Sequence, residues 1–151
     1  ANSTQSLLPM PAGNTSMSSG QAQRYLSFPV LTPGAIPVGW HLTRSSLDNL
    51  GSPQAGVHFA GYFASYAPNG SNDMRSITIA ELSDGGRPTG ITSSPTITLA
   101  DGSVGYLKVT SFPAQVATSV SWWSHGGQYS VGSIGATTAQ VIAVANAMTA
   151  R

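Results

Sequence analysis

The chain has 151 residues, of which 40% are hydrophobic and only 7% are charged, against about 25% charged residues in an average soluble protein. Its six basic residues are scattered singly and exceed the five acidic ones by one, which argues against a nucleic-acid-binding surface. Cysteine is absent, which excludes disulfides, thiolate nucleophiles and thiolate metal sites. Such a length and composition are typical of one domain with a single core.

Residues 1–24 are rich in Ser, Asn, Gly, Gln and Pro, and we expect them to form an extended arm or linker. The only apolar cluster available to anchor this arm is Leu7, Leu8 and Met10. An extended segment gains most by adding to an exposed sheet edge. We therefore expect the arm to dock against a sheet, preferably that of a neighbouring subunit.

Residues 25–151 are predicted to form one domain. Prolines and glycines between residues 32 and 39 favour an extended opening, and Trp40 to Thr43 then alternates as a first strand. Arg44 to Gly56 is predicted to be an irregular connection. Alternation predicts further strands over Val57 to Tyr66 and Met74 to Leu82.

The second half of the domain shows two hairpin patterns. Asp101-Gly102 separates two apolar runs and is the strongest hairpin signal in the chain. The second turn, Ser124 to Gly127, joins a strand carrying Val120 and Trp122 on one face to a strand carrying Tyr129 and Val131.

The C-terminal segment is predicted to be a helix. Thr137 and Gln140 have the spacing of a capping box. Apolar residues follow at i, i+3, i+4 and i+7, which forms one stripe that can pack on a sheet; they are Val141, Val144, Ala145 and Met148. The pattern predicts an α+β fold, with a meander-like antiparallel sheet of about six or seven strands covered by this helix. An all-β sandwich with a terminal helix is the alternative.

Two segments carry a resemblance to a known family. The first is Phe28-Pro29-Val30-Leu31-Thr32-Pro33 followed by Ile36-Pro37-Val38-Gly39-Trp40-His41-Leu42, and the second runs from Trp122 to Met148. Together they resemble an uncharacterised extracytoplasmic bacterial domain found at the C-terminus of anti-sigma-factor-like and sporulation-type membrane proteins. The resemblance implies an exported, non-enzymatic module with no catalytic residues. The chain departs from the family in its low Lys and Glu content and in Val38, where an acidic residue is common.

The residues offer little catalytic chemistry. The three histidines, His41, His58 and His125, have no acidic residue at metal-ligand spacing, so we expect no metal and no cofactor. A Ser-His-Asp triad assembles only in space, but the chain has no Gly-x-Ser-x-Gly elbow. A glycosidase would need a pair of carboxylates. The chain offers five candidates, most of them in or beside predicted turns; they are Asp48, Asp73, Glu81, Asp84 and Asp101.

Aromatic residues offer a surface for contacts instead. Trp123 faces away from Trp122 on a strand, and an exposed indole there could stack on a sugar or another subunit. Tyr62 and Tyr66 are further candidates for an exposed aromatic contact. The alternative is that the helix or the arm covers Trp123. Glycosylation sequons occur at Asn2, Asn14 and Asn69, all in arm or turn segments.

These patterns lead to one expectation for function. We expect a non-enzymatic structural or assembly subunit outside the cytoplasm, secreted or at the cell surface, whose partner is a second copy or another envelope protein. No apolar run reaches the length of a membrane span. A sensor or protein-binding module of an envelope regulatory system is the first alternative, and a carbohydrate-binding module is the second.

Overall fold

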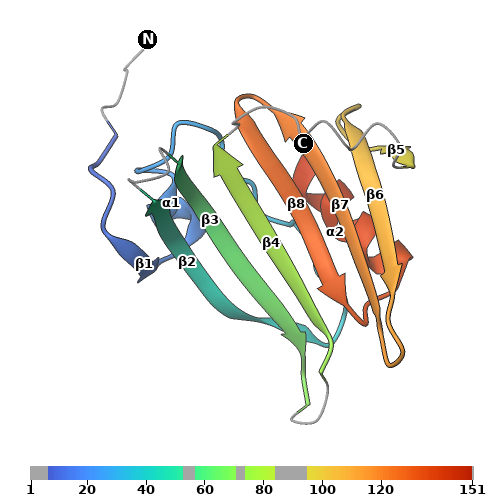
Figure 1. Ribbon diagram of the computed structural model, residues 1–151. Helices are drawn as coiled ribbons and strands as arrows, with labels where there is room; N and C mark the ends of the chain where they lie inside the picture. The colour runs from blue at the N-terminus through green and yellow to red at the C-terminus, as the bar shows by residue number, and fades with distance from the viewer. Residues whose placement is uncertain (1–6, 53–56, 71–73, 84–94, 151) are drawn as a thin grey trace.

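The computed structural model describes residues 7–52, 57–70, 74–83 and 95–150. They form one eight-stranded antiparallel sheet and two helices (Figure 1). The strands are β1 (Gly13–Ser16), β2 (Trp40–Ser52), β3 (Val57–Pro68), β4 (Ser76–Ser83), β5 (Thr96–Thr98), β6 (Val104–Ser111), β7 (Val116–Ser124) and β8 (Gly127–Ile134). The helices are α1 (Ser19–Ala22) and α2 (Thr138–Thr149). The α+β class is confirmed, with eight strands in place of six or seven.

The strand order is β1-β2-β3-β4-β8-β7-β6-β5. Each half of the sheet is a meander of neighbours, and the halves meet where β4 pairs with β8. After β4 the chain crosses to the far edge and returns strand by strand to the centre (Figure 1). Residues distant in sequence are therefore brought together in the middle of the sheet.

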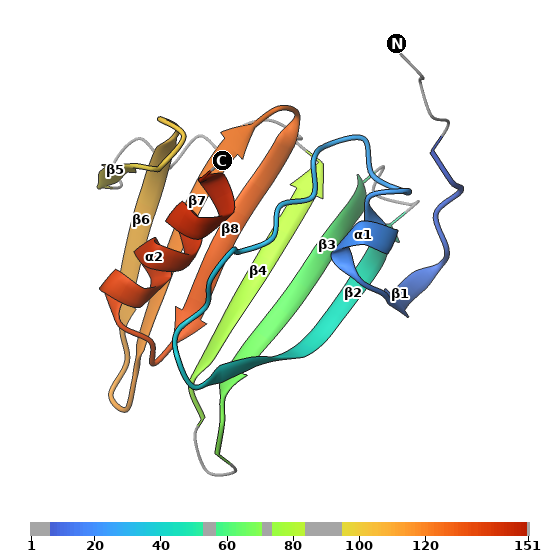
Figure 2. The same ribbon diagram turned by 180° about the vertical axis from the view of Figure 1, so that it is seen from behind.

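The two helices and the extended residues 27–39 lie on the same face of the sheet. Figure 2 shows α2 across β7 and β8, α1 against β2, and the extended residues 27–39 running over β4. We call residues 27–39 the strap. In the part of the chain that the structure describes, neither helix is long and apolar enough to cross a membrane.

The helix and the central strands meet as their apolar patterns predict. Thr137 caps α2, and its capping box with Gln140 is complete. The predicted stripe is buried, because Val141, Val144, Ala145 and Met148 all face the sheet. They join Val120 and Trp122 of β7 in one core, as predicted from the sequence.

The prediction for residues 44–56 is wrong over most of its length. Strand β2 continues to Ser52, with a register shift between Leu42 and Arg44. The segment has weak hydrophobic alternation, but β3 on one side and β1 on the other supply hydrogen-bonding partners for its backbone. Tertiary pairing of this kind commonly outweighs local strand preference.

The predicted turns are confirmed. Asp101-Gly102 closes the connection between Leu99 and Ser103, whose backbones are hydrogen-bonded. His125 and Gly126 join β7 to β8 with φ values of 51° and 80°. Two successive positive φ values are characteristic of the type I′ turn that suits a tight hairpin.

Candidate functional site

The arm docks on the edge of the chain's own sheet in this single chain. Met17 donates its backbone N–H to Ser45 O at 3.1 Å, and Gly13–Ser16 continues that pairing along β2. Because N–H groups alternate in direction along a strand, those of Gly13 and Thr15 also point toward β2. The N–H groups of Asn14 and Ser16 point away from the sheet.

The predicted anchors of the arm differ in their burial. Leu8 and Met10 are half-buried, and Met10 packs against the core, whereas Leu7 is 50% exposed. Polar contacts add to these anchors, since Leu8 N donates to Arg24 O at 3.0 Å and Asn49 Nδ2 donates to Pro11 O at 3.1 Å. Docking on a neighbouring subunit stays a prediction.

Residues near the end of the predicted arm belong to the core. Ala22 of α1 is fully buried, and Ser18 and Gln21 form a second capping box at the start of that helix. The Gln23 side chain donates to Leu26 O and Phe28 O and accepts the Val30 N–H at 2.7 Å. Gln23 thus fixes the start of the strap.

A buried carboxyl group lies beneath the strap. Glu81 of β4 is 0% exposed and stands in a cross-strand row between Tyr62 of β3 and Tyr129 of β8. Trp122 ends the row, with its ring stacked on Tyr129 at a centroid distance of 5.6 Å. A carboxyl group is thereby enclosed among aromatic rings.

Glu81 has one hydrogen bond for its two oxygens. Oε1 accepts the backbone N–H of Leu31 at 2.5 Å, while Oε2 is buried without a partner. Burial penalises the charged carboxylate and raises the pKa of Glu81 from 4.5 to about 8, although the Leu31 bond opposes this shift. At neutral pH Glu81 is therefore mostly the neutral acid.

The sequence held a signal for this residue. Glu81 has the same strand parity as Ile77 and Ile79, both of which are buried. Alternation alone therefore places the carboxyl on the core face of β4. The expectation drawn from the sequence treats Glu81 only as one of the five carboxyls of a glycosidase, and its core position is a finding of the structure.

The three residues expected to offer an exposed aromatic contact, Tyr62, Tyr66 and Trp123, do not share one face of the sheet. Tyr62 is only 4% exposed, so its expected role as an exposed contact is wrong; it belongs to the core on the covered face of the sheet, with its hydroxyl 2.8 Å from Ser45 Oγ. Tyr66 is half-buried on the same face. Burial is the main cause that raises the pKa of both tyrosines. Trp123 is half-buried on the opposite face, with Tyr106 packed edge-on at 5.7 Å.

Ser124, His125 and Asp101 line one cavity of about 250 Å³. Ser124 Oγ lies 2.6 Å from His125 Nδ1, and Asp101 Oδ1 accepts the Ser103 N–H at 2.9 Å. In a triad the acid bonds the imidazole nitrogen that faces away from the serine. Among the contacts of these described side chains, none joins Asp101 to His125. The set stabilises two turns and forms no triad.

The remaining predicted ligands are dispersed. His41 Nδ1 lies 2.6 Å from Asn69 Oδ1 at the β2–β3 end of the sheet, and Asp48 bonds Ser46. The side chain of His58 and residues Asp73, Asp84 and Asn2 lie outside the described part of the chain. Within that part, no group of three potential metal ligands is found. Asn14 and Asn69 are exposed.

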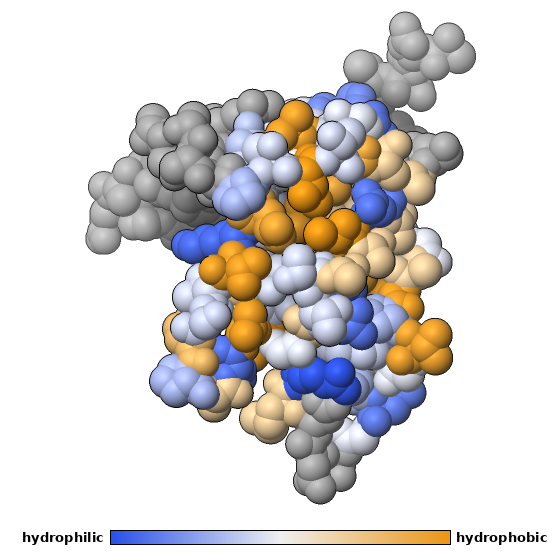
Figure 3. Space-filling view, turned by 90° about the vertical axis from the view of Figure 1, so that its right-hand side faces the viewer, coloured by the Kyte–Doolittle hydropathy of each residue, from blue (hydrophilic) through white to orange (hydrophobic). Residues whose placement is uncertain are grey.

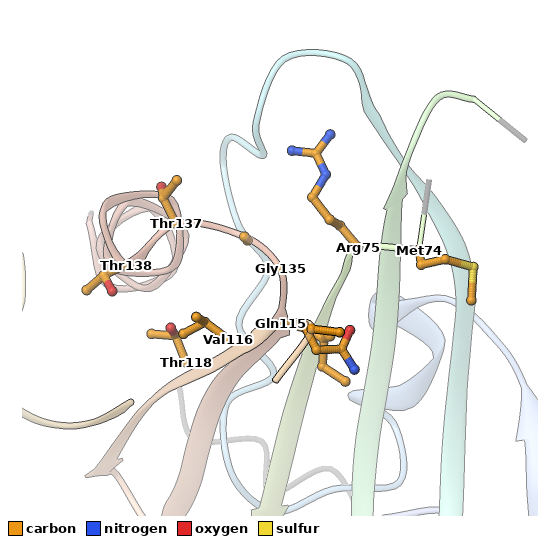
Figure 4. Close-up of a pocket in the computed structure, with 11 residues that line it drawn as sticks. Met74, Arg75, Gln115, Val116, Thr118, Gly135, Thr137 and Thr138 are labelled. Atoms are coloured by element: carbon orange, nitrogen blue, oxygen red, sulfur yellow. The ribbon is translucent and has the colours of Figure 1, made fainter. Parts of the chain in front are cut away.

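A larger cavity of about 580 Å³ lies at the N-terminal end of α2 (Figure 4). Its wall is formed by the starts of β4 and β7, the end of β8 and the first residues of the helix. Arg75 is the only titratable side chain among the described residues of that wall, and its guanidinium lies 5.4 Å from the centroid of the Trp40 ring. One cation among threonines and apolar side chains provides no acid and base pair.

Comparison with protein-family models, with curated proteins and with solved structures found no match to this chain.

Proposed function

We propose that the protein is a non-enzymatic extracytoplasmic module that assembles through protein–protein contacts, with its N-terminal arm as an exchangeable edge strand. The observation that carries the proposal is the short pairing of Gly13–Ser16 with β2. In an exchanged pair, the arm of one copy would make the same contacts on β2 of another copy. Such swapping costs little, because the contacts are identical.

The arm is attached in a way that permits exchange. Its paired strand has four residues, of which only Thr15 is half-buried, and its main apolar contacts are the half-buried Met10 and Met17. Backbone hydrogen bonds to a sheet edge do not depend on which copy supplies the strand, so the arm of a second copy can form them equally well. The low charge of the surface adds support, because it gives little repulsion between copies.

A second surface could support larger assemblies. Strand β5 pairs only with Val104–Tyr106, so the outer edge of β6 beyond these residues has no partner among the described strands. Val109 and Phe112 beside it are 50% and 53% exposed. Figure 3 shows this side of the molecule, with hydrophobic residues exposed among polar ones. An open edge with exposed apolar groups favours association.

Two proline variants test the role of the arm. Thr15→Pro removes an N–H that points toward β2, whereas Asn14→Pro removes one that points away and serves as the matched control. We expect light scattering to show concentration-dependent association for the wild type and Asn14→Pro, and a monomer for Thr15→Pro. A wild-type protein that is monomeric at every concentration would show the proposal to be wrong.

A sensor or protein-binding module of an envelope regulatory system is the second candidate. The buried Glu81 favours it, because a core carboxyl whose pKa is raised to about 8 can couple structure to its surroundings. Trp123 gives the carbohydrate-binding alternative less support, since Tyr106 packs against its ring.

A further inference from the structure

The strap is the part of the Glu81 environment that can yield most easily. It has no regular secondary structure between residues 27 and 39, whereas β3, β4 and β8 are joined by continuous ladders. Beyond the Leu31 bond, Tyr129 Oη donates to Pro29 O at 2.5 Å, and Gly34 N donates to Ala147 O at 3.4 Å. These hydrogen bonds, the buried Phe28 and the partly buried Val30, Leu31 and Ile36 hold this segment against the sheet and α2.

Among the residues that the structure describes, no cation is placed to compensate Glu81 if it ionises. The titratable groups that face it are Tyr62 and Tyr66 from β3 and Tyr129 from β8. Neither α1, α2 nor the strap contains a charged residue. The described basic residues are all exposed; they are Arg24, Arg44, Arg75 and Lys108. An ionised Glu81 in the closed structure would be a buried charge with one hydrogen bond, which is unfavourable.

We propose that the strap is a pH-dependent cover that opens when Glu81 ionises, admitting water to Oε2 and exposing the row of aromatic residues on the sheet. Opening exchanges the Leu31 hydrogen bond for full solvation of the carboxylate. Opening breaks the contacts of Phe28 with Tyr129 and of Gly34 N with Ala147 O. The sheet and α2 stay folded, because the strand ladders and the packing of α2 on β7 and β8 remain in the open form. This inference concerns the folded single chain and is independent of arm exchange.

The sign of the pH dependence follows from proton linkage. In the closed form burial keeps Glu81 protonated up to about pH 8, whereas in the open form the carboxyl ionises in its ordinary range near 4.5. Between these two values opening releases one proton, so the ratio of open to closed molecules rises about tenfold per pH unit. Below and above this window the ratio is constant.

Amide hydrogen exchange measured by NMR between pH 6 and pH 8 tests the proposal. The reporters are the N–H groups of Val30 and Leu31, and protection factors remove the intrinsic pH dependence of exchange. We expect the protection factors of these two N–H groups to fall about tenfold per pH unit, because opening releases one proton from Glu81. Val131 in β8 is the internal control, and its protection should not follow this slope.

Two variants separate the titration from the other contacts of the strap. Glu81→Gln keeps an acceptor for Leu31 but cannot ionise, so its strap protection should not change with pH. Tyr129→Phe removes the bond to Pro29 and leaves Glu81 in place, so its protection should be lower at every pH with the same slope. Strap protection in the wild type that is independent of pH would overturn the proposal, as would an equal slope in Glu81→Gln.

Discussion

Trp122 and Tyr129 lie directly opposite each other on β7 and β8, and their rings stack with an interplanar angle of 18°. Phe28 of the strap packs edge-on against the same tyrosine at 6.1 Å. The strap and the β7–β8 hairpin, which are distant in the chain, therefore meet at Tyr129. This aromatic cluster joins the strap to the centre of the sheet.

Adjacent tryptophans should differ strongly in their contribution to stability. Trp122 is 0% exposed, and its replacement by Ala should lower the free energy of unfolding by about 4 kcal/mol through lost burial and a cavity. Trp123→Ala, on the half-buried opposite face, should cost clearly less. Urea unfolding of both variants checks this difference, and equal losses would contradict the assignment of faces.

A charge on the buried side of α2 should unfold the domain. Val144 is 1% exposed against the sheet, so Val144→Asp would bury an unpaired carboxylate and remove about 4 kcal/mol or more. Ala143→Asp on the exposed side of the same helix is the control and should melt close to the wild type. A cooperative melt of Val144→Asp near the wild-type temperature would show that the helix packs elsewhere.

Global stability should fall as the pH rises from 5 to 8. The pKa of Glu81 is raised from 4.5 to about 8 in the folded chain, so in this window the native state keeps a proton that the unfolded state has lost. The contribution is fully present below 4.5, decreases by about 1.4 kcal/mol per pH unit and is lost above about 8. Denaturant unfolding of the wild type and Glu81→Gln at several pH values isolates the contribution of Glu81 to the free energy of unfolding. A difference between the two proteins that does not change with pH would refute this assignment.

A methyl group at Gly61 should be poorly tolerated. A Cβ added there would lie 2.5 Å from Leu82 Cδ2 and 2.7 Å from Glu81 O, so Gly61→Ala should cost about 2 kcal/mol through overpacking. At Gly132 the nearest atom would be 4.0 Å away, and Gly132→Ala should lie within about 0.5 kcal/mol of the wild type. Thermal unfolding of the pair checks the close approach of β3 and β4, and a stable Gly61→Ala would argue against it.

Local chemistry in the sequence determined the elements whose signals are self-contained. The capping box of Thr137 and Gln140 and the apolar stripe after it define α2, because caps and helical periodicity act within one segment. Asp101-Gly102 and His125-Gly126 define hairpins for the same reason, since a tight turn depends on its own φ angles. Strand parity likewise placed Trp122 in the core.

Tertiary structure decided what depends on partners distant in the chain. Residues 44–52 became strand because β1 and β3 flank them, although their own pattern is weak. Parity placed Glu81 on the core face, but only the crossing from β4 to the far edge brought Tyr129 beside it and the strap above it. The raised pKa of Glu81 arises from that enclosure. No local pattern encodes it, because desolvation depends on every element that excludes water from the carboxyl.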